Sequence, residues 1–146
     1  MTEPVFVDTS VLVYARDASA GEKQPRAQEW IAHLWRAQTG RVSFQVLHEY
    51  YVTVTRKLKP GLSQTEAREE IRNLMTWRPR ATDDTVVEGA WAIEDRFGLN
   101  FWDALLVSAA HAAGCRYMLT EDLQHGQDLD GVKVLSPFVA GPASVT

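Results

Sequence analysis

The sequence predicts an α/β domain in which helices cover both faces of a parallel sheet. Short apolar runs rich in β-branched residues alternate along the chain with segments of helical periodicity. Strands separated by helices favour a parallel sheet buried between two helical layers. With 146 residues, the chain can build one domain with a substantial core but not two ordinary domains. We therefore expect a single domain over 1–146, with its core over about 4–138 and a flexible tail at 139–146.

The strands are expected where short apolar segments stand between the helical ones, at 4–8, 41–44, 116–120 and 132–135. The helices are expected at 10–16, 22–38, 45–58, 63–77, 83 or 84 to 97, and 101–113. In 22–38, apolar residues recur at helical spacing. Ser63 followed by Glu66 forms a capping-box pattern, and Gly98 stands where a glycine ends a helix. Segment 101–113 is apolar almost all round and should be buried.

Composition and charge narrow the range of functions. The net charge of −4 comes from 19 acidic and 15 basic residues, so any contact with nucleic acid should depend on locally clustered cations. No apolar run approaches the roughly 18–20 residues of a membrane span, and MTEPVFVDTS lacks the pattern of a secretory signal. Cys115 is the single cysteine, so no internal disulfide can form. We therefore expect a cytoplasmic protein without membrane partners.

Four acids are placed to converge on one edge of the predicted sheet. Asp8 directly follows the first strand, and Asp122 almost directly follows the third. Asp103 lies in the first turn of the apolar helix, and Glu49 lies one turn into the helix after the second strand. Parallel strands end on the same edge, and ligands of such sheets bind in the crevice there. We therefore expect these side chains to share a crevice.

Each acid also has a purely structural interpretation. Asp8 can cap the following helix, and Asp103 can serve the helix dipole in its first turn. Glu49 can be a solvated helix residue, and Asp122 an acid of a polar loop. The set as a whole is harder to explain in this way, because converging carboxylates repel one another without a cation or a shared proton. Ligands that are all oxygens suit Mg²⁺ or Mn²⁺, which can activate a water for attack on a phosphate.

Segments over most of the chain resemble one known family. FVDTSVLVYARD, VLHEYYVTVTRKL, FWDALLVSAAHAAGCRYMLTEDLQHGQ and VKVLSPF are together similar to a PIN domain of the VapC toxin type, from about Val5 to Phe138. The resemblance implies a three-layer α/β sandwich whose parallel sheet has the strand order 3-2-1-4-5. It implies a Mg²⁺- or Mn²⁺-dependent endoribonuclease that acts on RNA as the toxin of a toxin–antitoxin pair. It also implies a homodimer that a small cognate antitoxin inhibits.

The resemblance assigns roles to individual side chains. It gives a catalytic role at a metal site to the four acids Asp8, Glu49, Asp103 and Asp122. Asp8 and Asp103 are the expected metal ligands, and Glu49 and Asp122 are candidate further ligands. Supporting polar roles are assigned to two hydroxyl residues, Ser10 and Thr120.

Two alternatives stay open. Glu121 stands beside Asp122, and only the T-x-D pattern of the family favours Asp122. The protein can also be a catalytically inactive PIN-fold protein that binds RNA or a partner. An intact acidic set argues against this alternative, because a cluster of carboxylates costs stability without a cation. A receiver-like phosphate-binding domain is excluded, because Lys133 lies inside the last strand and follows no phosphoacceptor pattern.

Other polar and aromatic residues receive mostly structural interpretations. Trp30 and Trp35 are the expected docking surface for a partner, and Trp102 is interpreted as a packing residue. His48 should point away from Glu49, because neighbours in sequence do not share a helix face. The cations at 56–59 are interpreted as a solvated helix end.

Overall fold

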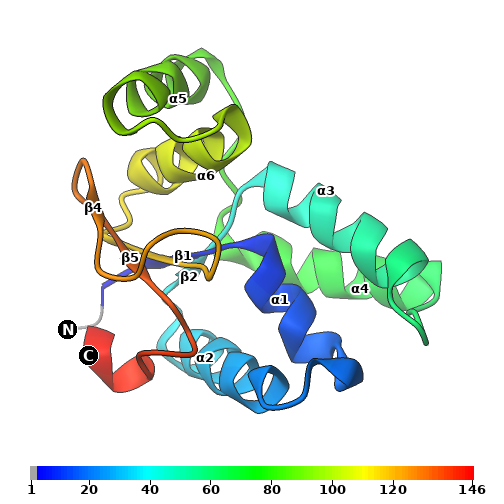
Figure 1. Ribbon diagram of the computed structural model, residues 1–146. Helices are drawn as coiled ribbons and strands as arrows, with labels where there is room; N and C mark the ends of the chain where they lie inside the picture. Colours follow the sequence, from blue (N-terminus) through cyan, green and yellow to red (C-terminus); the bar gives the residue numbers. More distant parts are fainter. Residues whose placement is uncertain (1–2) are drawn as a thin grey trace.

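The computed structural model describes residues 3–146. At its centre is a five-stranded sheet in the order β2-β1-β3-β5-β4 (Figure 1). The strands are short: β1 Val5–Val7, β2 Gly40–Arg41, β3 Tyr117–Leu119, β4 Asp128–Leu129 and β5 Val132–Leu135. The pairs β1–β2, β1–β3 and β3–β5 are parallel, whereas β4 pairs antiparallel with β5. The predicted parallel α/β sheet is therefore confirmed, with an antiparallel strand added at one edge.

The predicted strand order is found once an isolated bridge beyond β2 is included. Ser43 pairs in parallel with Arg80, whose backbone bonds to Val42 and Phe44 at 3.0 Å each. On the side of β2 that faces β1, the carbonyl of Thr39, just before β2, accepts a hydrogen bond from the Val5 amide. Arg80 bonds to residues just after β2 and lies on the side of β2 away from β1. With this bridge as the third strand, the parallel order reads 3-2-1-4-5.

Strand β4 was not predicted, although its turn has a sequence signal. Asp130 and Gly131 connect β4 to β5, with φ angles of 57° and 95°. Positive φ at both central residues is the requirement of a type I′ hairpin turn, for which Asp-Gly is a preferred pair. The turn is also held by a 2.7 Å hydrogen bond from the Gly131 amide to Oδ1 of Asp128. The strand itself has only two residues, too few to show a period in the sequence.

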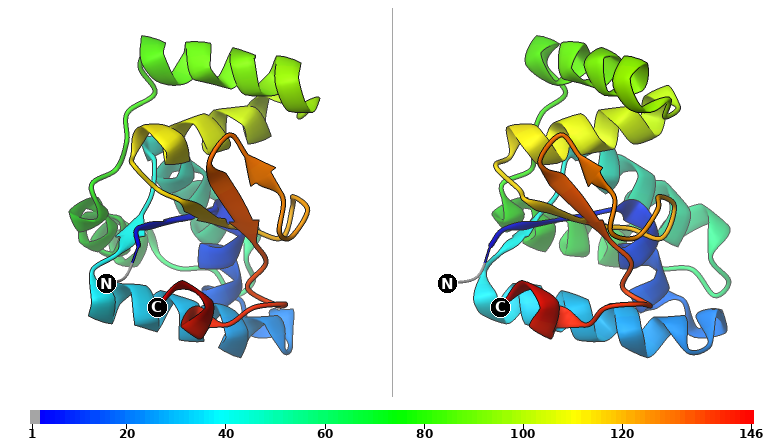
Figure 2. Two further views of the ribbon diagram at one scale, coloured as in Figure 1. Left: turned by 90° about the vertical axis from the view of Figure 1, so that its left-hand side faces the viewer. Right: turned by 60° about the vertical axis from the view of Figure 1, so that its left-hand side comes forward.

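Helices lie on both faces of the sheet. The α-helices are α1 Thr9–Arg16, α2 Lys23–Ala37, α3 Phe44–Val52, α4 Gln64–Leu74, α5 Asp84–Phe97 and α6 Phe101–Ala112. Short turns are the 3-10 helices η1 Ala18–Ala20, η3 Met75–Trp77 and η4 Pro142–Val145, and the π-helix η2 Thr53–Lys57. Helices α5 and α6 cover one face and α2 the other, while α1, α3 and α4 pack together beside the sheet (Figures 1 and 2).

Local signals explain the ends of several helices. Ser63 and Glu66 form the predicted capping box at α4, with reciprocal hydrogen bonds of 3.1 Å. Gly98 ends α5 in the left-handed conformation, with φ 69°. The single helix expected over 45–58 is wrong in its last turn. Regular α-helix ends at Val52, and the β-branched segment that follows winds as the π-helix η2.

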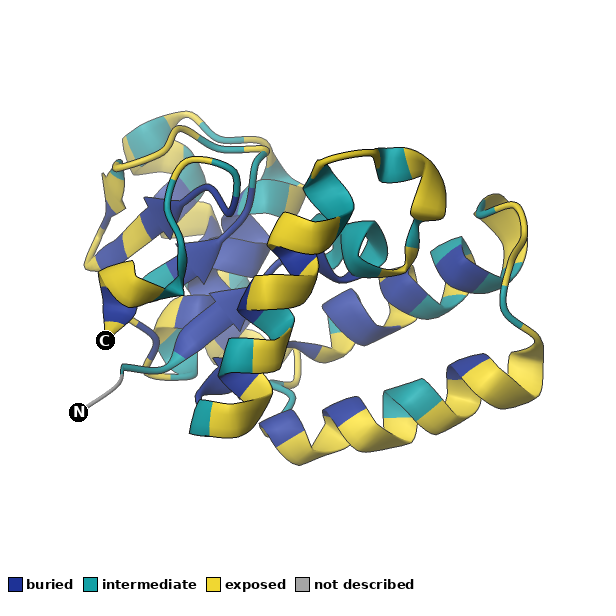
Figure 3. Cartoon of the chain, turned by 90° about the horizontal axis from the view of Figure 1, so that it is seen from below, coloured by how far each residue is buried: buried dark blue, intermediate teal, exposed yellow. Residues whose placement is uncertain are grey.

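The core is formed by the strands and the inner faces of the helices (Figure 3). All of β1 is buried, and so is the run Ala104–Ala110 of α6, as its apolar sequence predicts. The tail at 139–146 differs from the expected flexible segment. It forms η4, with Val145 buried, and the Ala140 carbonyl accepts a 2.9 Å hydrogen bond from Nε1 of Trp30. Within residues 3–146, no helix is both long and apolar enough to cross a membrane.

Candidate active site

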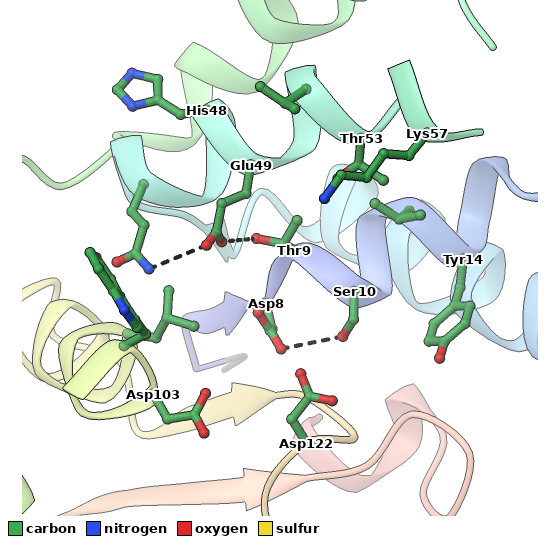
Figure 4. A pocket seen from close by; sticks show the side chains of 15 residues that line it. Asp8, Thr9, Ser10, Tyr14, His48, Glu49, Thr53, Lys57, Asp103 and Asp122 are labelled. Atoms are coloured by element: carbon green, nitrogen blue, oxygen red, sulfur yellow. Dashed lines mark hydrogen bonds between the residues drawn. The ribbon is translucent and has the colours of Figure 1, made fainter. Parts of the chain in front are cut away.

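A cleft of about 680 Å³ opens at the carboxyl ends of β1 and β3. All four predicted acids line it, with Asp8, Asp103 and Asp122 drawn below and Glu49 above them in Figure 4. They come from four separate parts of the fold: the end of β1, helix α3, the first turn of α6 and the loop after β3. The expected convergence of the four side chains on one crevice is therefore what the structure shows.

Asp8 is the most buried of these acids, with 4% of its surface exposed. It occupies the N-cap position of α1, but its side chain makes no capping hydrogen bond. Instead, its Oδ2 accepts from Oγ1 of Thr120 at 2.7 Å and from Oγ of Ser10 at 3.2 Å. The carboxylate is thus held in the cleft by two hydroxyls, which does not support the interpretation of Asp8 as a simple helix cap.

Burial raises the pKa of Asp8 from 3.8 to about 6. The hydrogen bond from Thr120 opposes this shift, and the negative charge of Asp122 adds to it. A carboxylate with so high a pKa is in an environment that disfavours its charged form. A cation bound in the cleft would remove this penalty.

Asp103 combines a structural and a cleft-facing position. Its backbone amide donates to Oδ1 of Asn100 at 2.9 Å, and Nδ2 of Asn100 donates to its Oδ2 at 2.8 Å. The side chain therefore helps to begin α6 and also faces the other acids (Figure 4). Burial raises the pKa of Asp103, the contact with Asn100 lowers it, and the charges of Asp122 and Glu49 raise it further. The position of Asp103 in the first turn of α6 is therefore compatible with a position in the cleft, and its role as a metal ligand stays a prediction.

Glu49 and Asp122 are the exposed members of the set. Oε1 of Glu49 accepts a 2.7 Å hydrogen bond from Oγ1 of Thr9, which joins α3 to the start of α1. The Asp122 amide donates to Oγ1 of Thr120 at 3.1 Å, so the same threonine contacts both Asp8 and the loop of Asp122.

The structure separates Glu121 from Asp122. The Glu121 carboxylate accepts a hydrogen bond from the Tyr14 hydroxyl and pairs with Nζ of Lys23 at 2.9 Å. Lys23 also stands over the rings of Tyr14 and Phe138, 5.0 and 5.2 Å from their centroids. Asp122 lines the cleft, whereas Glu121 is not among its lining residues. The choice of Asp122 therefore agrees with the geometry.

Three residues that received other interpretations also line the cleft: His48, Lys57 and Trp102. His48 lies at the rim, and its ring is directed away from the Glu49 carboxylate, as expected (Figure 4). Lys57 lines the cleft from the last residue of η2, the π-helical turn that continues α3. Short π-helical segments are frequent at functional sites. In this sequence, the only hint of one is the β-branched residues near the end of the predicted helix.

The donor set suits a hard divalent cation bound largely through water. Within residues 3–146, no group of three Asp, Glu, His or Cys side chains stands close enough together to hold one ion. Mg²⁺, however, usually takes only one or two carboxylates and keeps several waters. The buried Asp8, with its raised pKa and acidic neighbours, is where a cation would relieve the largest electrostatic penalty.

The fold and the cleft define an α/β protein with an acidic site at the carboxyl edge of a parallel sheet. The chain belongs to the PIN domain family, whose model matches residues 5–127. No curated protein sequence matches the chain significantly.

Solved structures share the fold at low sequence identity. FitAcB from Neisseria gonorrhoeae has 17% identity and a TM-score of 0.66, with 93% of this chain and 99% of that chain covered. A toxin–antitoxin complex from Klebsiella pneumoniae has 16% identity and a TM-score of 0.64, covering 91% and 97%. VapC20 of Mycobacterium tuberculosis, a toxin that cleaves the sarcin–ricin loop, has 22% identity and a TM-score of 0.58, covering 78% and 86%.

Proposed function

We propose that this PIN domain is a Mg²⁺- or Mn²⁺-dependent endoribonuclease, acting in the cytoplasm as the VapC-type toxin of a toxin–antitoxin pair. The observation that carries the proposal is the convergence of four carboxylates around the buried Asp8. The likeness of the fold to VapC20, a toxin that cleaves RNA at the sarcin–ricin loop, supports the choice of RNA as substrate.

The side chains divide the work of such a reaction. Asp8 and Asp103 would hold the ion, with Glu49 and Asp122 as further ligands through water. When bound, the ion would polarise the phosphate and lower the pKa of an attacking water. Thr120 and Ser10 both donate to Oδ2 of Asp8, so they orient the carboxylate while leaving its Oδ1 for the ion.

The remaining residues of the cleft would position the substrate and move a proton. Glu49 and Asp122 are exposed, so either carboxylate can accept a proton from the attacking water. The Lys57 ammonium is directed into the cleft from η2 (Figure 4), where it can pair with a phosphate of the strand.

Cleavage is expected to depend fully on a divalent cation. Purified protein should cut a labelled RNA in Mn²⁺ or Mg²⁺, stop in EDTA, and resume when the metal is added back in excess. A DNA strand of the same sequence is the control for substrate class. Undiminished cleavage in chelator would contradict the metal-dependent mechanism, whereas binding without cleavage in any metal would support the inactive PIN-fold alternative.

We also propose a small antitoxin as partner and a homodimer as the assembly. A groove of about 300 Å³ between α1, α2 and α4 offers a docking site, with Leu12, Ile31, Trp35 and Leu74 among its lining residues. The paired charges of Arg16 and Glu70 also line it. Trp30, the other expected docking residue, is fully buried and belongs to the core, so that part of the expectation is wrong.

Trp35→Ala is expected to weaken antitoxin binding by about 30-fold, the effect of removing a tryptophan anchor worth about 2 kcal/mol. The measurement is the affinity of the variant for the product of a small neighbouring gene. Trp91→Ala is the matched control, since Trp91 is also exposed but lies on α5, away from the groove. Equal affinity of parent and Trp35→Ala would place the partner on another surface.

A further inference from the structure

The carboxylate cleft continues into a second pocket of about 550 Å³. The two share the side chains of Gln45, His48, Glu49 and Trp102, so they are neighbouring parts of one surface. Trp102 is the largest side chain that lines both. The second pocket adds apolar contributions from Phe44 and Leu105.

Trp102 is exposed far more than a packing residue would be. It directly precedes Asp103 in the first turn of α6, and 64% of its surface is accessible. The Phe101 ring meets the indole nearly edge to face, with centroids 5.4 Å apart and planes at 71°. This contact holds the indole from one side and leaves most of it open to solvent. An exposed aromatic side chain beside an active site is a platform for a flat apolar ligand.

The two ends of this surface differ in positive charge. Lys57 lines the cleft and lies on the opposite side of Glu49 from His48 in Figure 4. Among the described residues, no lysine or arginine lines the second pocket. Phosphates are attracted to the lysine end, whereas the aromatic end favours an uncharged group.

Gln45 lines both pockets and carries an unpaired polar atom. Its Nε2 donates weakly to Glu49 at 3.5 Å, while its Oε1 is buried with no hydrogen-bond partner among the described residues. An unpaired buried acceptor costs free energy, and a rotation of the Gln45 side chain toward the pocket would let a ligand donor pair with it. The edge of a nucleobase carries such donors, and an apolar peptide side chain does not.

We propose that the second pocket is a nucleobase subsite, in which an unpaired base of the RNA next to the scissile phosphate stacks on Trp102. This inference rests on the proposed ribonuclease function and specifies the form of its substrate. The base must be unpaired, because a base within a duplex does not expose its face for stacking. Phe44 is another apolar residue of this pocket, with its ring tilted 43° to the His48 ring at a centroid distance of 6.4 Å.

The test uses labelled single-stranded oligoribonucleotides whose bases are removed one position at a time. Binding is measured by fluorescence anisotropy in EDTA at low salt, so that no cleavage occurs. Trp102→Ala should bind the intact strand about 10- to 100-fold more weakly than the parent. Trp102→Phe should recover most of the affinity, and Trp91→Ala, which removes a similarly exposed tryptophan from α5, should match the parent.

The abasic series identifies what the pocket holds. Removing the base at one position of the strand should weaken binding to the parent by a factor similar to that of Trp102→Ala. The Trp102→Ala variant should bind the intact strand and this abasic strand equally, because its stacking partner is already absent. In Mn²⁺, Trp102→Ala should raise KM with little change in kcat, as for an interaction used in binding substrate and transition state alike.

The outcomes separate this subsite from the ribonuclease activity itself. Trp102-dependent loss at one abasic position, without cleavage in any metal, would support the subsite and refute the nuclease. Cleavage by Trp102→Ala with unchanged KM, or equal sensitivity of parent and variant at every position, would overturn the subsite and leave the nuclease standing. Absence of RNA binding by the parent, or a Trp102→Ala defect confined to antitoxin binding, would also overturn it.

Discussion

Asp8→Asn is expected to reduce the rate of RNA cleavage at least about a thousandfold, which corresponds to about 4 kcal/mol of lost transition-state stabilisation. The amide has nearly the size of the carboxylate, and its oxygen can still accept from Thr120 and Ser10. The fold should therefore survive while the charge that holds the cation is lost. Asp103→Asn should act in the same direction, because its side chain faces the same cleft.

The measurement is single-turnover cleavage in Mn²⁺, with far-ultraviolet circular dichroism to verify folding. Glu121→Gln is the matched control among the acids, since Glu121 is not among the residues that line the cleft and its carboxylate bonds to Tyr14 at the cleft edge and to Lys23 beyond it. We expect Glu121→Gln to stay within about tenfold of the parent, because a neutral hydrogen bond to Tyr14 remains and a partly exposed ion pair contributes little. A folded Asp8→Asn variant that cleaves like the parent would show that Asp8 has no role in catalysis.

The unfolding free energy of the metal-free protein is expected to depend on pH, because the Asp8 carboxylate is buried. Its folded-state pKa of about 6 lies above the ordinary value of 3.8, so the folded protein binds a proton more tightly than the unfolded chain. Unfolding free energy should therefore rise as pH falls through about 6, and the full gain is reached below about 3.8. From pH 7 to pH 5, the metal-free protein should gain about 1 kcal/mol from this group.

Asp8→Asn should remove this pH dependence and stabilise the metal-free protein at pH 7 by about 2 kcal/mol, because no buried charge remains. Metal should reverse the preference. An ion that binds only the folded parent stabilises it by about 2.7 kcal/mol at a hundred times its dissociation constant, and the variant should gain much less.

Urea unfolding of parent and variant at pH 7 and pH 5, in EDTA and in excess Mn²⁺, measures how the unfolding free energy depends on pH, on the Asp8→Asn substitution and on metal. Asp95→Asn serves as the control, because Asp95 is exposed on α5 and should leave both the pH dependence and the metal effect unchanged. If Asp8→Asn destabilises the metal-free protein at pH 7 and metal stabilises both proteins equally, Asp8 is a structural residue and not a metal ligand.

Much of the site was predictable because it depends on local order along the chain. An apolar strand followed by Asp8, and another followed closely by Asp122, place both residues at one edge of any parallel sheet. The apolar sequence of α6 predicts its burial and therefore the position of Asp103 at its exposed start. Such rules concern the period of a segment and the direction of a strand, both of which the sequence contains.

Other features depended on contacts between distant segments. Glu121 bonds to Tyr14 and Lys23, which are 107 and 98 residues away in sequence, and does not line the cleft. Val145 and the Ala140 carbonyl hold the tail in place, the latter through Trp30, 110 residues away. Side-chain partners of this kind are not specified by the period of either segment.

The sequence by itself determined the α/β class, the main helices and strands, and the four acids that meet at the sheet edge. The tertiary structure alone decided which neighbouring acid enters the cleft, that Lys57 lines it, and that Trp102 stays exposed beside it. The physical reason is that periodicity predicts which face of an element is apolar. Burial and hydrogen bonding of a particular side chain depend on which other elements pack against that face.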